Sequence, residues 1–238
     1  PGTAIIPDAY SENGYSVLAN ASSLAAPITA GVAALLVQQA VQDEALQAAT
    51  ADAPMNCVIK AILMNSARKF PYWHKGGITE EDDMYMPLDR LQGAGALDAE
   101  AAMAQLVAGQ QPPGDVPPLG WDSRSIGQDE TLFYVFGATD PDTMLTATLT
   151  WNRYFENRYP FRLRPEQSDL RLELWAIDPT APDGVILLDV SDSPNDTVEH
   201  LWTPLSVDVS HYMIVVRFSP EATRPAPASA TRSRPPTR

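Results

Sequence analysis

The sequence predicts an α/β fold in its first half and an all-β domain of the sandwich or jelly-roll class in its second half. Apolar residues recur at helical spacing up to about residue 110, and they alternate at strand spacing beyond residue 120. Between the two patterns lies "AGQQPPGDVPPLG", whose four prolines are typical of an interdomain linker. We therefore expect an α/β part over 1–110, a linker over 111–120 and a β domain over 121–220.

The first half carries three helical patterns. Residues 24–40 are apolar on nearly every face, which predicts a helix buried on all sides. Residues 55–67 form a second pattern, with apolar side chains at helical spacing: Val58, Ile59, Ile62 and Leu63. After a polar and aromatic loop over 70–91, "GAGALDAEAAMAQLV" predicts a glycine-rich turn that leads into a third helix.

The second half carries five short segments rich in β-branched and aromatic residues: "TLFYVFGA", "MLTATLTW", "LRLELWAI", "GVILLDV" and "YMIVVRF". Clusters of Asp, Pro, Gly and Asn separate them, as between the strands of an antiparallel sandwich. Residues 221–238 consist of Pro, Ser, Thr, Ala, Arg and Glu without a large apolar residue, so we expect a disordered tail.

Composition restricts the partners of the chain. Its formal net charge of −14 argues against nucleic acid, because phosphate binding requires clustered Lys and Arg. No apolar run in the sequence approaches the roughly 18 residues needed to cross a bilayer, so we expect no membrane span. The single cysteine, Cys57, excludes an internal disulfide, and its apolar neighbours predict a buried thiol. We expect a monomer.

Two serines precede the first helical pattern, in "NASSLAAPITAGVAALL". Ser22 or Ser23 could serve as a helix N-cap, which is the simpler interpretation. The small residues that follow allow another backbone to approach closely, and a serine at the positive end of a helix is also well placed for nucleophilic chemistry.

This stretch resembles the nucleophile motif of the subtilisin-like serine proteases, Gly-Thr-Ser-Met-Ala-x-Pro-His-Val-Ala-Gly. Ser23 takes the place of the nucleophile, Ser22 that of the threonine and Ala21 that of the glycine. Ile28 and Thr29 stand where the family has His-Val. Other stretches resemble further blocks of the family in the same order: "PGTAIIP" with "GYSVLANAS", then "IKAILMNSA", then "QGAGALDAEAAM".

The resemblance implies that residues 1–110 are the C-terminal part of a doubly wound parallel-sheet peptidase domain with Ser23 as its catalytic residue. The parent chain would be a secreted bacterial endopeptidase acting on protein or peptide substrates, with its signal peptide upstream. In this family the Asp and His of the triad precede the serine, so both would lie before Pro1. We therefore expect this segment alone to be inactive and the helix from Leu24 to expose apolar surface.

The three histidines, His74, His200 and His211, all follow Ser23, and we expect structural or surface roles for them. The alternative to an enzyme is a degenerate, non-catalytic homologue whose β domain serves as a binding or secretion module. That domain resembles, more loosely, the pre-peptidase C-terminal and P-type sandwiches that follow bacterial protease domains.

Two further patterns bear on ligands. The run "EEDD", Glu80 to Asp83, has carboxylates that suit calcium but lacks the spacing of a calcium loop, so a solvated turn is favoured and a structural Ca²⁺ stays open. No cofactor is expected. Trp151, Trp175 and Trp202 could form a platform for carbohydrate, but core positions explain them better.

Overall fold

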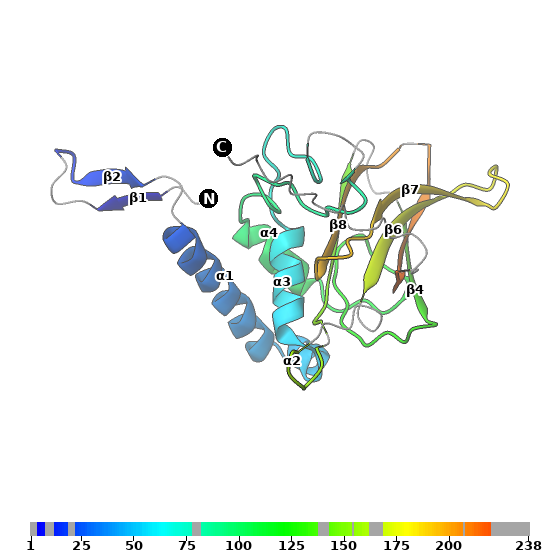
Figure 1. Cartoon of the computed structure of the whole chain (residues 1–238), viewed down its shortest axis with the longest axis horizontal. Helices are drawn as coiled ribbons and strands as arrows, with labels where there is room; N and C mark the ends of the chain where they lie inside the picture. The colour runs from blue at the N-terminus through cyan, green and yellow to red at the C-terminus, as the bar shows by residue number, and fades with distance from the viewer. Residues whose placement is uncertain are drawn as a thin grey trace, which may run out of the picture.

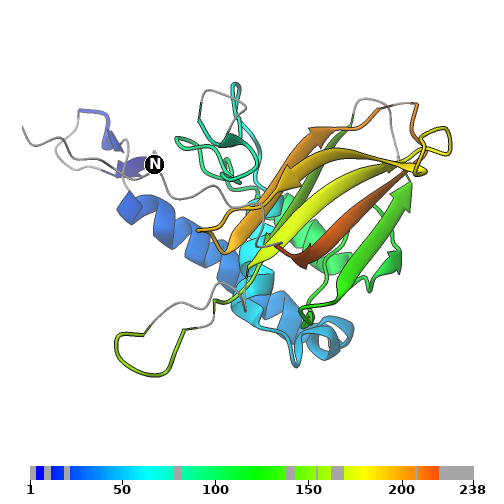
Figure 2. The same ribbon diagram turned by 45° about the vertical axis from the view of Figure 1, so that its right-hand side comes forward.

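The computed structural model describes residues 4–7, 12–18, 22–77, 82–137, 143–153, 155–161, 169–206 and 208–219. It places a helical region beside a β region, so the expected division into helical and strand-rich halves is confirmed at this coarse level (Figures 1 and 2). The expected tail, 221–238, lies outside the described residues.

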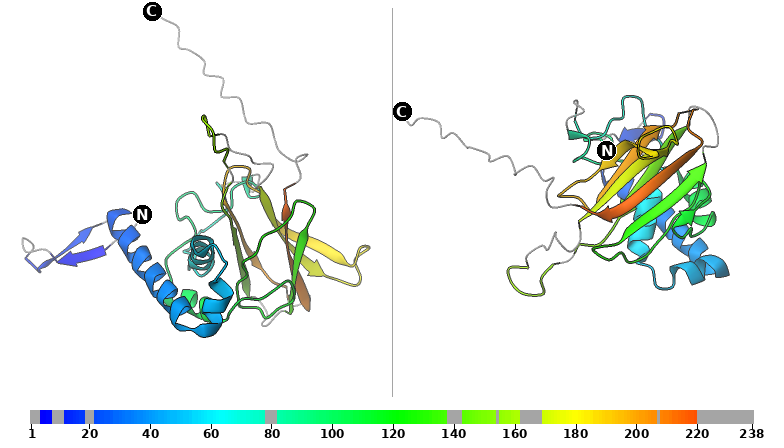
Figure 3. Two further views of the ribbon diagram at one scale, coloured as in Figure 1. Left: turned by 90° about the horizontal axis from the view of Figure 1, so that it is seen from below. Right: turned by 90° about the vertical axis from the view of Figure 1, so that its right-hand side faces the viewer.

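The helical region begins with a hairpin and a long helix. Strands β1 (Ala4–Pro7) and β2 (Tyr15–Leu18) pair antiparallel, and α1 (Ser22–Gln42) follows. Figure 3 shows the hairpin projecting away from the rest of the molecule beyond the N-terminal end of α1. No parallel sheet occurs among the described residues of this first half.

Three shorter helices complete the region: α2 (Glu44–Thr50), α3 (Met55–Asn65) and α4 (Ala99–Val107). Asp43 caps α2 by accepting the Ala45 and Leu46 amides, and Asp98 caps α4 by accepting the Ala101 amide. The predicted second and third helices thus correspond to α3 and α4, while α2 was not predicted. The helices share a core: Leu36, Ala40, Leu46, Val58, Ile59, Ile62, Ala102 and Leu106, with Trp121.

The prediction that the first helix is buried on all sides is wrong. Of the residues of α1, Leu36 and Ala40 are buried, whereas Leu35 and Val41 have exposed fractions of 54% and 60%. The reason is that α2, α3 and α4 pack against α1 from one side, as Figure 3 shows. The expectation that this helix exposes apolar surface is confirmed.

Helix α1 is also long and apolar enough to cross a membrane, by length and composition alone. This differs from the expectation that no apolar stretch reaches that length. Core helices of soluble proteins and signal sequences meet the same criteria, so the finding is weak evidence for a membrane span.

The β region contains a five-stranded sheet in the order β3-β4-β9-β6-β7. Its strands are β3 (Gly114–Asp115), β4 (Thr131–Gly137), β6 (Leu170–Ile177), β7 (Val185–Ser191) and β9 (His211–Phe218). All neighbours are antiparallel except β3 and β4, which are parallel. The sheet is therefore mixed.

A second sheet consists of β5 (Met144–Thr150) and β8 (Val198–Pro204), paired antiparallel from Met144 opposite Pro204 to Thr150 opposite Val198. The two sheets share one hydrophobic core, which includes Leu132, Phe136, Ala147, Leu172, Leu174, Leu201, Tyr212 and Val216. Helix α3 packs on β5, so the two-stranded sheet lies between the helices and the larger sheet (Figure 3).

The proline-rich segment over 111–120 is packed in place. It contains β3, and the backbones of Gln110 and Trp121 form an isolated bridge. The Trp121 side chain enters the core of the helices. This segment therefore connects the two regions through contacts with both, rather than as an extended spacer.

Candidate functional site

Ser23 lies in the first turn of α1, and its side chain is exposed. Within the described residues its hydroxyl has no hydrogen-bond partner. Pro27, four residues later in the helix, has no amide proton to donate to the Ser23 carbonyl. At the start of α1, the Ser23 hydroxyl therefore has no partner among the described residues, and the Ser23 carbonyl receives no hydrogen bond from the residue four positions later.

The electrostatic surroundings of Ser23 favour negative charge. The first amides of a helix have no intrahelical acceptor, and the helix dipole places partial positive charge at the same end. The first turn of α1 contains no acidic residue that would compensate this charge. The arrangement suits an anionic group, such as the oxyanion of an acyl-transfer intermediate.

No histidine is hydrogen-bonded to Ser23, although the structure describes all three. The Nδ1 atom of His74 lies 2.6 Å from the carbonyl of its neighbour Lys75, and that of His211 lies 3.0 Å from the Ser210 hydroxyl. His200 is fully buried on β8. The expectation of structural or surface roles agrees with these positions, and no histidine of the described residues is placed as a general base for Ser23.

Two of the stretches that resemble blocks of the protease family lie against α1, and the other two form the hairpin that precedes it. The first two form the hairpin β1–β2, with Ala4 opposite Leu18. The third lies on α3, and the fourth leads into α4; both helices contact α1 (Figure 1). Segments far apart in the sequence thus pack on one side of the helix that carries Ser23.

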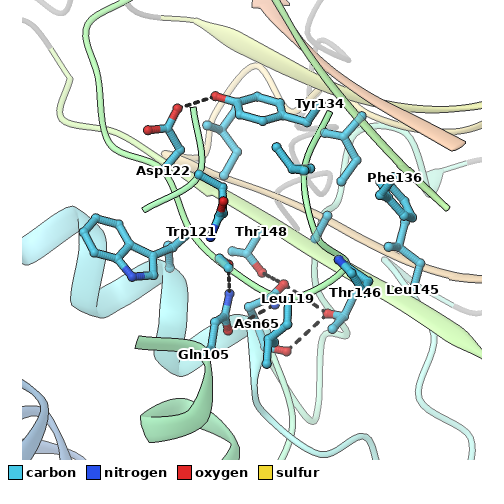
Figure 4. Close-up of a pocket in the computed structure, with 18 of the residues that line it drawn as sticks. Asn65, Gln105, Leu119, Trp121, Asp122, Tyr134, Phe136, Leu145, Thr146 and Thr148 are labelled. Atoms are coloured by element: carbon cyan, nitrogen blue, oxygen red, sulfur yellow. Dashed lines mark hydrogen bonds between the residues drawn. The ribbon is translucent and has the colours of Figure 1, made fainter. Parts of the chain in front are cut away.

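A second candidate site is a cavity of about 210 Å³ between α3, α4 and the inner face of the sheets. Figure 4 shows that its polar side chains gather at two ends. At one end Tyr134 donates its hydroxyl to Asp122 over 2.7 Å, and burial raises the pKa of Tyr134. Most of the wall between the ends is apolar, with Ile62, Leu119, Phe136, Leu145 and Val216 among its residues.

At the other end of this cavity, side chains form a directed chain of hydrogen bonds (Figure 4). Gln105 donates to the Gly120 carbonyl over 3.0 Å, so its side-chain oxygen accepts the Asn65 amide over 3.2 Å. The Asn65 side-chain oxygen is then left to accept the Thr148 hydroxyl over 3.1 Å. These polar groups are paired with one another.

The chain continues to His200, whose Nδ1 lies 2.8 Å from Thr148 Oγ1. Because Thr148 uses its proton on Asn65, the network assigns the His200 proton to Nδ1. Burial holds the pKa of His200 well below its usual value, so the ring is neutral. Its Nε2 is buried without a partner among the described residues.

The other expected ligand sites are not assembled. Glu80 and Glu81 lie outside the described residues, while Asp82 accepts the Gly77 amide and Asp83 lies 3.6 Å from His74. In the described part of the chain, no group of three His, Cys, Asp or Glu side chains could hold a metal ion. Cys57 is buried and unpaired, as expected, and burial raises its pKa.

The three tryptophans proposed as a platform lie in separate surroundings. Trp202 packs edge-to-face on Trp73, with ring centroids 5.1 Å apart, and Trp175 donates its indole N–H to Glu173. Trp151 follows β5 and lines a hollow between α3 and the sheets. All three are half-buried, so neither a joint platform nor a fully buried core describes them.

No protein-family model matches the chain, and no curated protein matches it either. The candidate sites therefore depend on the residues themselves and on the resemblance described above.

Sequence reasoning missed the buried polar residues of β8. Glu199 and His200 are both fully buried, although charged and polar side chains rarely are. A signal was present in "TVEHLW", where two polar residues interrupt an apolar segment between predicted strands. The pattern does not alternate, so β8 was absent from the five strands inferred from spacing.

Proposed function

We propose that Ser23 is the nucleophile of a subtilisin-like serine endopeptidase, with the Asp and His of its triad supplied by residues outside this chain. One observation carries the proposal: the exposed, unpartnered hydroxyl of Ser23 stands at the positive end of α1. The family resemblance of the neighbouring stretches supports it, since two of them lie on or lead into helices that pack against α1.

The chemistry follows from this position. Ser23 Oγ would attack the carbonyl carbon of a peptide bond while a general base takes the hydroxyl proton. The amides at the start of α1 would stabilise the oxyanion, and the amine of the cleaved bond would leave with the proton returned by the base. In the part of the chain that the structure describes, none of the three histidines is hydrogen-bonded to Ser23, so we expect this segment to be inactive alone.

The exposed face of α1 is consistent with the same proposal. In the proposed enzyme, further residues of the peptidase domain would cover Leu35 and Val41, which are exposed here. The β region would be an appended module of the sandwich class, and its two sheets with one shared core support that assignment.

The second candidate is a non-catalytic homologue whose β region binds a partner or aids secretion. The observation that favours it is that none of the chain's three histidines pairs with Ser23. The two candidates differ in whether a longer form of the protein has a reactive Ser23.

A fluorophosphonate probe tests this difference, because it labels only a serine that an adjacent base activates. We expect a longer form that includes residues upstream of Pro1 to be labelled at Ser23 and to cleave casein. Ser23→Ala should abolish both, whereas Ser22→Ala, a matched change one residue earlier, should retain labelling. A folded longer form that takes no label at Ser23 would overturn the proposal and favour the non-catalytic homologue.

A further inference from the structure

We propose that the hollow between α3 and the sheets binds an uncharged, largely apolar small molecule whose single hydrogen-bond acceptor is held by the indole N–H of Trp151. This binding site is independent of Ser23 and of the proposed peptidase activity.

The hollow has two adjacent chambers. The first is the cavity of about 210 Å³ described above, and the second, of about 340 Å³, extends toward Trp151. Six residues line both chambers: Ala61, Asp122, Tyr134, Thr148, Leu149 and Val216. The two chambers therefore share a wall from α3 to β9 and lie side by side.

The size and lining suit a small ligand better than water. Tight packing is the rule in protein interiors, so a hollow of this size beside a core is unusual. An apolar cavity of about 150 Å³ can stay dry and take up benzene. The apolar wall of the first chamber is of this kind, because its polar groups are already paired with one another.

One polar group in the hollow is unpaired. Trp151 Nε1 is buried and has no hydrogen-bond partner among the described residues. An indole N–H can only donate, and leaving a buried donor unpaired is unfavourable. A ligand oxygen that accepts this proton would remove that cost, and it would place the ligand's polar atom beside Trp151, a residue that lines the second chamber.

The charges in the hollow exclude ionic ligands. Asp122 and Arg124 are the charged residues among those that line the two chambers. They neutralise each other, with Arg124 Nε 2.5 Å from Asp122 Oδ2. An anion or a cation entering the hollow would find no unpaired opposite charge, so it would lose hydration without compensation.

Three probes with one ring and different charges test the proposal on the full chain: benzyl alcohol, benzoate and benzylamine. We expect benzyl alcohol to shift the Trp151 indole resonance in ¹H–¹⁵N spectra saturably while that of Trp175, outside the hollow, stays in place. Calorimetric affinities for the two charged probes should be weaker by about tenfold or more. The Trp151→Phe variant assigns the resonance, because it removes the indole. It should also weaken the affinity for benzyl alcohol by about fivefold to tenfold.

A filling variant and its matched control complete the test. Ala61→Leu adds volume to the wall that both chambers share and should abolish binding, whereas Ala104→Leu adds the same volume on an exposed part of α4 and should not. The proposal is overturned if benzyl alcohol causes no saturable shift, or if all three probes bind alike. Should Ala61→Leu fail to fold, unchanged affinity in Trp151→Phe would overturn it.

Discussion

Trp121 donates its indole N–H to the main-chain carbonyl of Leu106 over 2.9 Å. Leu106 lies in the last turn of α4, and its carbonyl also accepts the Gly109 amide over 3.1 Å. The ring itself is buried among the helices, although Trp121 lies between β3 and β4 of the five-stranded sheet. This single residue thus joins the two halves of the chain.

Removing this side chain should destabilise the protein strongly. We expect Trp121→Ala to lower the free energy of unfolding by about 3–5 kcal/mol, because it leaves a cavity, and Trp121→Phe by about 1–2 kcal/mol, mainly through the lost hydrogen bond. Leu91→Ala, at a side chain that is 83% exposed, serves as the control and should cost at most about 0.5 kcal/mol. Urea denaturation measures all three. Equal costs for Trp121→Ala and Leu91→Ala would contradict the anchoring role.

Adjacent residues of α1 should respond in opposite ways to the same change. Leu36 is 0% exposed in the helical core, whereas Leu35 is 54% exposed. Leu36→Gln should cost several kcal/mol of stability because it buries an amide without a partner. Leu35→Gln should leave stability within about 0.5 kcal/mol and raise solubility, since it reduces the exposed apolar face.

Thermal unfolding and the saturating protein concentration check this pair on the chain of 238 residues. If Leu35→Gln were as damaging as Leu36→Gln, the uncovered face of α1 would have to be buried in solution.

The sequence predicted the elements of this fold better than their surroundings. Helices α3 and α4 and strands β4, β5, β6, β7 and β9 follow from local periodicity. The burial of α1 could not be predicted in this way. An all-apolar pattern indicates that a helix is suited to burial on every face, but it does not show which faces other elements cover. Likewise, the prolines over 111–120 indicated a segment without helix, and the contacts of Trp121 that hold it down are long-range.

The candidate sites also contain residues that local sequence could predict and residues that only long-range contacts bring together. Ser23 could be singled out because the helix start and the spacing of small residues are local features. The chain from Gln105 through Asn65 and Thr148 to His200 joins four separate elements, so no spacing in the sequence reveals it. The unpaired Trp151 is equally invisible before its neighbours are known.

Glu199 should make stability fall as the pH rises. Burial raises its pKa from 4.5 to about 9, although the Ser191 hydroxyl and the Ser193 amide donate to the carboxyl group. Between these values the folded protein holds a proton that the unfolded chain releases, so folding is favoured below about pH 4.5 and that advantage is lost by about pH 9.

Glutamine is neutral at every pH, so we expect Glu199→Gln to flatten the decline in the free energy of unfolding between about pH 5 and 8. The part of the decline that the variant removes should be on the order of 1–3 kcal/mol. The exposed Glu130→Gln is the control and should leave the decline unchanged. Urea denaturation at several pH values measures it; parallel profiles for Glu199→Gln and the unmodified chain would show that Glu199 is ionised in the folded state.

Thr148 should be the required acceptor of the His200 ring proton. Its hydroxyl lies 2.8 Å from His200 Nδ1 and donates its own proton to Asn65. Thr148→Val keeps the shape but leaves the buried Nδ1–H unpaired, which should cost about 1–3 kcal/mol. Thr148→Ser retains the hydroxyl and should cost less.

A double variant separates this hydrogen bond from packing. In His200→Phe no ring proton needs an acceptor, so Thr148→Val should cost less in that background than in the unmodified chain, and the difference is the coupling energy. Long-range ¹H–¹⁵N spectra of the His200 ring should also show the proton on Nδ1 at neutral pH. A proton on Nε2, or the same cost of Thr148→Val in both backgrounds, would mean that the chain of donors runs in the other direction.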